Sequence, residues 1–279
     1  CFDCCTSSFI VSIGESGSRG VIYLSKGNPV ETTYFLGREM TGSVAGSTIN
    51  IFMEGYPMGL FYAYKTEGIV QEGDTGPGFS LDQPLGPGHY KYVDVDGNGY
   101  IDSNDRTIIG DPNPDFTFGF NTSFSYKRLS LSVAFNGSYG NDVFNLNNDS
   151  EYDVGRYTYN LKKAAYVNAW TPQNPSDVFP ALGCVTGGDR THYRSNCVED
   201  ASYLRLSNVS ISYSVPIKKN KVIRGISLGV SGRNLAVFTK YSGWDPDVNS
   251  FGVNSLSNGF DYGSYPMVRS FILGLTAKF

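Results

Sequence analysis

The sequence predicts an all-β protein, specifically part of an antiparallel transmembrane β-barrel. The first observation is composition, because 33 Gly, 20 Tyr and 18 Phe among 279 residues, with 17% charged residues, favour turns and aromatic strands over helices. The second is a long alternation of apolar and polar residues, and the third is a contrast between short and long connections. The sequence has no run of eighteen or more apolar residues, so it does not predict a membrane-spanning helix. The net charge of -4 and the pI of about 5.2 argue against nucleic-acid binding.

The chain divides into two parts along its length. Residues 1–57 form an irregular N-terminal segment with room for partial strands, and residues 58–279 carry the regular strand pattern. The earliest clear strand is "MGLFYAYKTEGIVQ", residues 58–71. An acidic loop follows at residues 94–105, before the first long strand.

Five long strands are predicted, at residues 116–126, 129–139, 204–215, 226–238 and 267–279. In each strand one parity is apolar and the other is small or polar, as in Phe116, Phe118 and Phe120 against Thr117, Gly119 and Asn121. The last strand sets Phe271, Leu273, Leu275, Ala277 and Phe279 on one face. About ten residues at roughly 3.3 Å each, tilted by about 40°, span an apolar band of about 25 Å. Strands of a β-sandwich are usually shorter, at about five or six residues.

The connections alternate in length. Lys127 and Arg128 form one short turn and residues 216–225 another, whereas residues 140–201 and 239–265 are long. Counting strands from Phe116 places both short turns on one side and both long loops on the other. Short periplasmic turns and long outer loops are typical of outer-membrane barrels.

The stretch "DVDGNGYIDSND", residues 94–105, fits a calcium-loop template. The ligands would be Asp94, Asp96, Asn98, the Tyr100 carbonyl, Asp102 and Asp105, with Gly99 at the sharp bend. Closely spaced carboxylates repel one another unless a cation or Arg106 neutralises them. We therefore expect a structural Ca²⁺, although Asp-Gly and Asn-Gly also make ordinary tight turns.

Other residues carry weaker signals. Cys184 and Cys197 flank "VTGGDRTHYRSN" in a long loop, which predicts a disulfide, with two thiols as the alternative. Cys1, Cys4 and Cys5 have no matching second half of a zinc site. Catalysis is not expected, because no nucleophile, base and acid come together and only two histidines are present. The aromatic residues that are candidates to contact a substrate, or to pack the loops together, include Tyr157, Trp170, Tyr193, Tyr241 and Trp244.

Six blocks of residues resemble the C-terminal part of SusC/RagA-family TonB-linked outer-membrane transporters. They are "GLFYAYKTEGIVQ", "YVDVDGNGYIDSNDRTIIGDPNPDFTFGFNTSFSYKRLSLSVAFNGSYGNDVFN", "AWTPQNPSD", "SYLRLSNVSISYSVP", "VSGRNLAVFTKYSGWDPDV" and "YPMVRSFILGLTAKF". The resemblance implies a 22-stranded barrel in the outer membrane that imports oligosaccharides or peptides. It also implies a SusD-like lipoprotein lid, energy from TonB, and contact with outer-membrane lipid. The plug, TonB box and earlier strands are not in this sequence, so we expect the chain to be a fragment.

A function from another class remains open at this point. A secreted calcium-dependent carbohydrate-binding β-sandwich would share the acidic loop and the surface aromatics. The environment of the apolar parity distinguishes the two folds, because a sandwich buries that parity, whereas a barrel turns it toward lipid.

Overall fold

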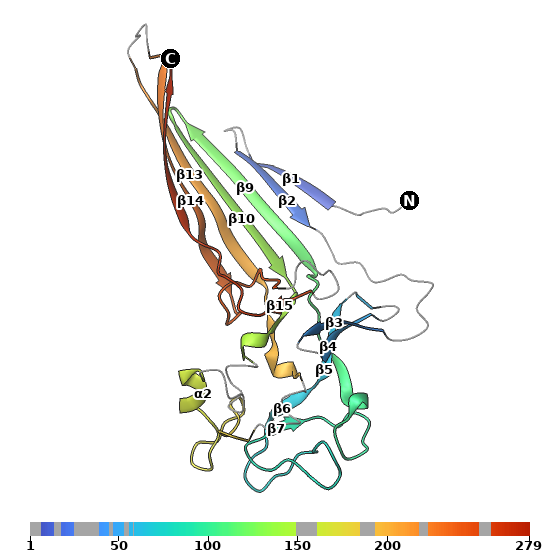
Figure 1. The fold of residues 1–279 in the computed structure, drawn as a ribbon. Coiled ribbons are helices and arrows are strands. Elements are labelled where there is room, and N and C mark those ends of the chain that lie inside the picture. Colours follow the sequence, from blue (N-terminus) through green and yellow to red (C-terminus); the bar gives the residue numbers. More distant parts are fainter. Residues whose placement is uncertain are drawn as a thin grey trace.

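The computed structural model describes residues 7–13, 18–24, 39–44, 47–52, 56–57, 59–148, 161–184, 193–217, 223–250 and 258–279. Two regions are visible in Figure 1, a long curved sheet and a group of short strands and turns beyond one end of it. In the described residues, no helix has the length and apolar character needed to cross a membrane.

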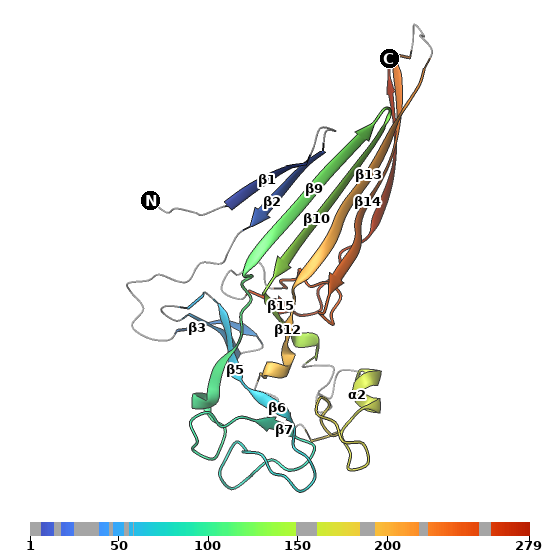
Figure 2. The same cartoon turned by 180° about the vertical axis from the view of Figure 1, so that it is seen from behind.

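The long sheet contains five antiparallel strands in the order β16, β14, β13, β10, β9. Their bounds are β9 Phe116–Tyr126, β10 Leu129–Tyr139, β13 Tyr203–Val215, β14 Gly225–Thr239 and β16 Ser270–Lys278. The predicted hairpin is confirmed, because Tyr126 pairs with Leu129 across the two-residue turn. Strands β1 (Ser7–Ile13) and β2 (Ser18–Leu24) form a hairpin beside β9 in both views (Figures 1 and 2). These two strands lie in residues 1–57, the segment expected to be irregular with room for partial strands.

The apolar parity of the long sheet is exposed. Leu273 is 84% exposed, Phe271 76% and Tyr126 59%, and the same face carries Ile211, Tyr213, Leu228 and Val230. A β-sandwich would bury this parity against a second sheet. The sandwich alternative is therefore wrong, and the sheet presents the face that a transmembrane barrel turns toward lipid.

A β-bulge interrupts the long strands at one level. Ser207 has no partner of its own in the register of β13 with β10 or β14, which steps from Leu206 to Asn208. Its hydroxyl donates to the Ala134 carbonyl oxygen at 3.0 Å. On β14 the bulge includes Asn234, whose φ of 52° is left-handed. The extra residue changes which parity faces outward, so Leu204 and Leu206 share the outer face with Val209 and Ile211.

The short-strand region lies at the end opposite the two-residue turn (Figure 1). One sheet runs β3 (Glu39–Val44), β4 (Ser47–Phe52), β5 (Leu60–Tyr64), β8 (Arg106–Gly110), and another runs β12 (Val198–Asp200), β11 (Asp142–Asn145), β15 (Phe260–Asp261). Strands β6 (Thr66–Ile69) and β7 (Tyr90–Tyr92) pair separately, and α2 covers Lys163–Val167.

A hydrophobic core joins the short sheets. Phe61 of β5, Phe144 of β11 and Phe260 of β15 are fully buried, with ring centroids 5.5–5.8 Å apart. These rings come from sequence positions far apart, so the two long loops and the sheet that contains β5 form one folded layer over the end of the long sheet. This layer positions the candidate site.

Candidate substrate pocket and acidic loop

A pocket of about 450 Å³, lined mostly by polar residues, opens within the layer formed by the loops. Its lining comes from the end of β11, the start of α2 and the segments that follow β14 and β15. The lining residues are Asn145, Asn147, Lys162, Ser242, Gly243, Trp244, Gly263 and Ser264.

Glu199 of β12 organises the polar floor of this pocket. Its Oε1 accepts hydrogen bonds from Asn145 Nδ2 at 3.0 Å, Asn148 Nδ2 at 2.6 Å and Ser242 Oγ at 2.8 Å. Its Oε2 accepts from the Ser242 amide at 2.8 Å. Four donors on one carboxylate fix the amides and the serine in place, so the floor is organised before any ligand arrives.

Two further groups near the floor have shifted pKa values. Burial lowers the pKa of the Lys162 ammonium, while the charges of Glu199 and Asp261 act in the opposite direction. Burial and its hydrogen bond to Asp261 raise the pKa of Tyr241, whose hydroxyl donates to Asp261 Oδ2 at 2.6 Å. The pocket therefore presents the Lys162 amino group and asparagine side-chain amides above a floor that Glu199 holds in place.

Trp244 forms the exposed wall of the pocket. Its side chain is 80% exposed, so its ring face is open to a sugar ring or an apolar peptide side chain. The other described aromatic candidates do not reach a ligand. Trp170, Tyr193 and Tyr241 are 7%, 5% and 5% exposed.

These buried aromatics pack the layer instead. Trp170 Nε1 donates to Gln71 Oε1 at 2.9 Å, and Tyr193 makes an edge contact with Phe144 at 5.8 Å. The burial of these three residues favours the alternative that they pack the loops together. Tyr157 lies outside the described residues. Glu199, Lys162 and Asn145 were missed because no motif marks them and their partners are distant in sequence.

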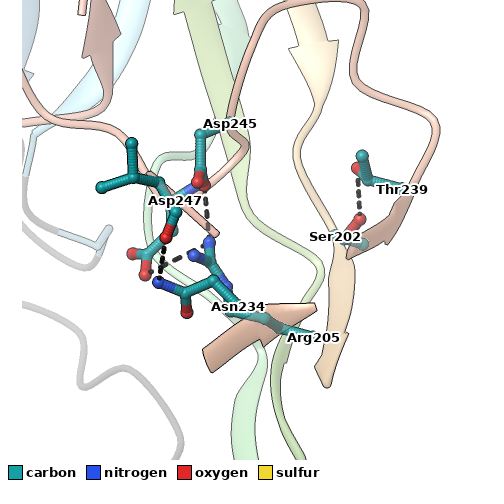
Figure 3. A network of polar contacts seen from close by, with 7 residues as sticks. Ser202, Arg205, Asn234, Thr239, Asp245 and Asp247 are labelled. Atoms are coloured by element: carbon teal, nitrogen blue, oxygen red, sulfur yellow. Dashed lines mark hydrogen bonds and ion pairs between the residues drawn. The ribbon is translucent and has the colours of Figure 1, made fainter. Parts of the chain in front are cut away.

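A buried ion pair anchors the segment that carries Trp244 (Figure 3). Arg205 Nη2 donates to Asp245 Oδ1 at 2.5 Å and lies 3.7 Å from Asp247 Oδ2. Arg205 and Asp245 are 2% and 4% exposed. Thr239 Oγ1 also donates to the Ser202 carbonyl oxygen at 2.9 Å. Because Trp244 directly precedes Asp245, the pair fixes the backbone of the pocket wall to β13.

The acidic loop brings three of the predicted calcium ligands together. Carboxylate oxygens of Asp94, Asp96 and Asp105 lie within 4.8 Å of one another. Calcium binds oxygen at about 2.3–2.6 Å, so ligands on opposite sides of one ion are about 5 Å apart. The spacing fits one Ca²⁺.

Backbone amides hold these carboxylates in place. Asp94 Oδ2 accepts from the Gly99 amide at 2.7 Å, and this bond is the main cause of the lowered pKa of Asp94. Asp105 is fully buried and accepts from the amides of Val95 and Asp102, both at 2.7 Å. Asp94 Oδ2 and Asp105 Oδ2 each accept one hydrogen bond and so keep a further lone pair that a cation can use, whereas Oδ1 of each residue accepts from two amides.

Two other predicted ligands are engaged elsewhere. Asp102 caps the 3₁₀ turn Ser103–Asp105, with its Oδ1 accepting from the Asn104 amide at 2.6 Å. Asn98 Oδ1 accepts from the Tyr100 amide at 3.0 Å. Ligation by these two side chains and by the Tyr100 carbonyl remains a prediction.

The predicted disulfide is wrong, because the structure does not join Cys184 to Cys197. Cys197 is drawn into the core with Phe61, Phe144 and Tyr193. Cys184 follows a turn in which its amide donates to the Ala181 carbonyl, and its Sγ lies 4.0 Å from the Pro87 carbonyl oxygen. Cys1, Cys4 and Cys5 lie outside the described residues.

Comparisons with known proteins agree on one family. No protein-family model matches the chain. The chain is 38% identical to TonB-dependent receptor P3 of Formosa agariphila over 236 residues, which cover 82% of this chain and 23% of that protein. It is 28% identical to TonB-dependent receptor SusC of Bacteroides thetaiotaomicron over 229 residues, covering 81% and 20%.

Solved structures share the fold. The RagAB peptide importer in its open-open state superposes with a TM-score of 0.68 at 22% identity, covering 98% of this chain and 28% of that one. The chain spans about a quarter of the length of the curated relatives that it matches. With the exposed apolar face of the sheet, these similarities show that the chain belongs to the SusC/RagA family of TonB-dependent outer-membrane receptors.

Proposed function

We propose that the chain forms the C-terminal part of an active importer, which takes up oligosaccharides or peptides and does no catalysis. The observation that carries this proposal is the pocket with Trp244 on its wall. The pocket lies at the loop end of the long sheet, and the outer face of that sheet is apolar. A substrate would enter from the loop end, stack on Trp244 and hydrogen-bond to the amides and Lys162.

The partners follow from the family. We propose a SusD-like surface lipoprotein as a lid over the loop end, and the TonB system as the energy source. The similarity to SusC supports a TonB-linked receptor, the similarity to a structure described as a peptide importer supports peptides, and oligosaccharides are what the resemblance of the sequence implies. An ammonium and several amides also suit either class, because sugars and peptides both offer hydroxyl or carbonyl oxygens.

Substrate binding to the complete receptor tests this proposal. Trp244→Ala should weaken binding of the transported glycan or peptide by about 1 kcal/mol, or roughly fivefold in Kd. Tyr166→Ala is the matched control, because Tyr166 is 65% exposed on α2 and does not line the pocket. Calorimetry with a panel of oligosaccharides and peptides would measure both. Equal affinity of wild type and Trp244→Ala for every ligand would refute the role of the pocket.

We also propose that Asp94, Asp96 and Asp105 hold a structural Ca²⁺. The ion would neutralise three carboxylates packed within 4.8 Å and fix the turn that precedes β8. Its role would be mechanical, since Asp105 ends the loop and Arg106 begins a strand of the core sheet.

A further inference from the structure

The turn between β9 and β10 has a hollow on the outer face of the sheet. Its volume is about 600 Å³, and Tyr126, Lys127, Arg128, Leu129 and Tyr213 line it. Tyr126 pairs with Leu129, and Leu129 pairs with Tyr213, so the three apolar walls belong to neighbouring strands and share one face. They are 59%, 44% and 42% exposed.

The geometry of the turn keeps cationic groups beside this hollow. Lys127 has a left-handed φ of 54°, and its ammonium nitrogen lies 5.1 Å from the centroid of the Tyr126 ring. The Ser214 amide donates to the Arg128 carbonyl at 2.8 Å, which ties the turn to β13. Lys127 is therefore held over the apolar face.

The location defines what surrounds the hollow. The short-strand layer lies at the opposite end of the long strands, so this turn is at the periplasmic end of the barrel (Figure 1). Tyrosines at this level belong to the aromatic belt at the membrane surface. The hollow thus faces the headgroup region of the inner leaflet of the outer membrane.

We propose that this hollow is a binding site for one anionic phospholipid. The lipid phosphate would lie between the Lys127 ammonium and the Arg128 guanidinium, and an acyl chain would lie along Leu129 between the two tyrosine rings. Opposite charge selects the headgroup, because a basic group near the surface attracts anionic lipid. The open rings and Leu129 provide the apolar contact that a free phosphate ion cannot use.

Lipid binding to the complete receptor in detergent tests the proposal. Native mass spectrometry would compare phosphatidylglycerol with phosphatidylcholine of the same acyl chains. Wild type should prefer phosphatidylglycerol, and the double variant Lys127→Gln/Arg128→Gln should lower that preference roughly 5- to 30-fold, as expected for one or two lost cationic contacts. The control Lys65→Gln/Lys91→Gln removes the same charge from exposed positions in the loop layer and should leave the preference unchanged.

A second measurement locates the lipid and does not depend on the variants. A photoactivatable phosphatidylglycerol should label Tyr126, Leu129 or Tyr213 in the wild-type receptor. Equal affinity of wild type for the two lipids, an equal loss in the control variant, or labelling confined to other strands would each overturn the proposal. Suppression of the labelling by inorganic phosphate at the lipid concentration would show an ion site and would overturn it too.

Discussion

At the scale of one residue, substitution of Asp96 tests whether residues 94–105 bind calcium or form an ordinary acidic turn. Its side chain is exposed and accepts from the Asn98 amide at 3.1 Å, so Asp96→Asn should leave the fold intact. Losing one charged ligand should weaken Ca²⁺ binding roughly tenfold, because affinity depends on the ligand charge. Hydrogen exchange of residues 94–105 during Ca²⁺ titration would measure this. Asp82→Asn, exposed outside the loop, should bind as wild type does, and no calcium effect in wild type would contradict the site.

Arg205 tests the second residue-scale feature, the buried ion pair behind the pocket wall. Arg205→Met leaves Asp245 buried without its cation, which should cost about 3–5 kcal/mol in the free energy of unfolding. The double variant Arg205→Met/Asp245→Leu should recover part of that loss, because no unpaired charge remains. Arg233→Met, at an exposed position of β14, should change stability by less than about 0.5 kcal/mol.

The free energy of unfolding of the complete receptor in lipid vesicles would be measured for wild type and for these three variants. A double variant as unstable as Arg205→Met would show that lost packing, not an unpaired charge, is the cause. This pair had no signal in the sequence, since Arg205 and Asp245 are forty positions apart. The clustering of the Asp94, Asp96 and Asp105 carboxylates was predictable because these residues are close in sequence, although the sequence did not reveal that Asp102 would cap a turn.

Individual strands were predicted well because alternation is a local property. Strands β9 and β10 begin and end at the predicted residues, and β13 and β14 differ by one residue at each differing end. Strand β16 begins three residues later and ends one residue earlier than predicted, and the strand expected at residues 58–71 is divided into β5 and β6, which belong to different sheets. The bulge at Ser207 was not predicted, because an inserted residue is defined only by its neighbours in β10 and β14. The same limit explains Trp170 and Tyr193, whose burial depends on contacts with segments about 50 or more residues away.

Substitutions of Asn234 test whether its left-handed backbone conformation stabilises the bulge in β14. Its left-handed φ of 52° is tolerated by Asn and Gly but costs other residues about 1–2 kcal/mol. Asn234→Ala should therefore destabilise the receptor more than Asn234→Gly by about 1 kcal/mol, although both lose the hydrogen bond to the Val268 carbonyl oxygen. Thermal unfolding of the two variants would compare them. A less stable glycine variant would show that the conformation of Asn234 is not the constraint.

The whole molecule is polarised along its strands. An apolar outer face covers the middle of the sheet, basic residues lie at the two-residue turn, and a folded layer with the pocket lies at the other end. The sequence predicted this polarity from the lengths of the connections. It did not predict the core of the layer, where Phe61, Phe144 and Phe260 meet from three separate strands.

At the scale of the whole molecule, substitutions in strand β16 test whether the outer face of the long sheet contacts lipid. Leu273 pairs with Val230 of β14, is 84% exposed and lies between Phe271 and Leu275 on the apolar parity, so it should face the middle of the lipid layer. Leu273→Lys should cost about 2–4 kcal/mol, because an ammonium at the midplane loses its water. Thr276→Lys places the same charge on the opposite parity of the same strand, where a barrel interior tolerates it.

Heat-modifiable gel mobility of outer-membrane fractions should show less assembled receptor for Leu273→Lys only. Receptor that assembles should bind substrate normally, since Leu273 is remote from the pocket at the loop end, and equal assembly of both variants would mean that this face of β16 does not contact lipid.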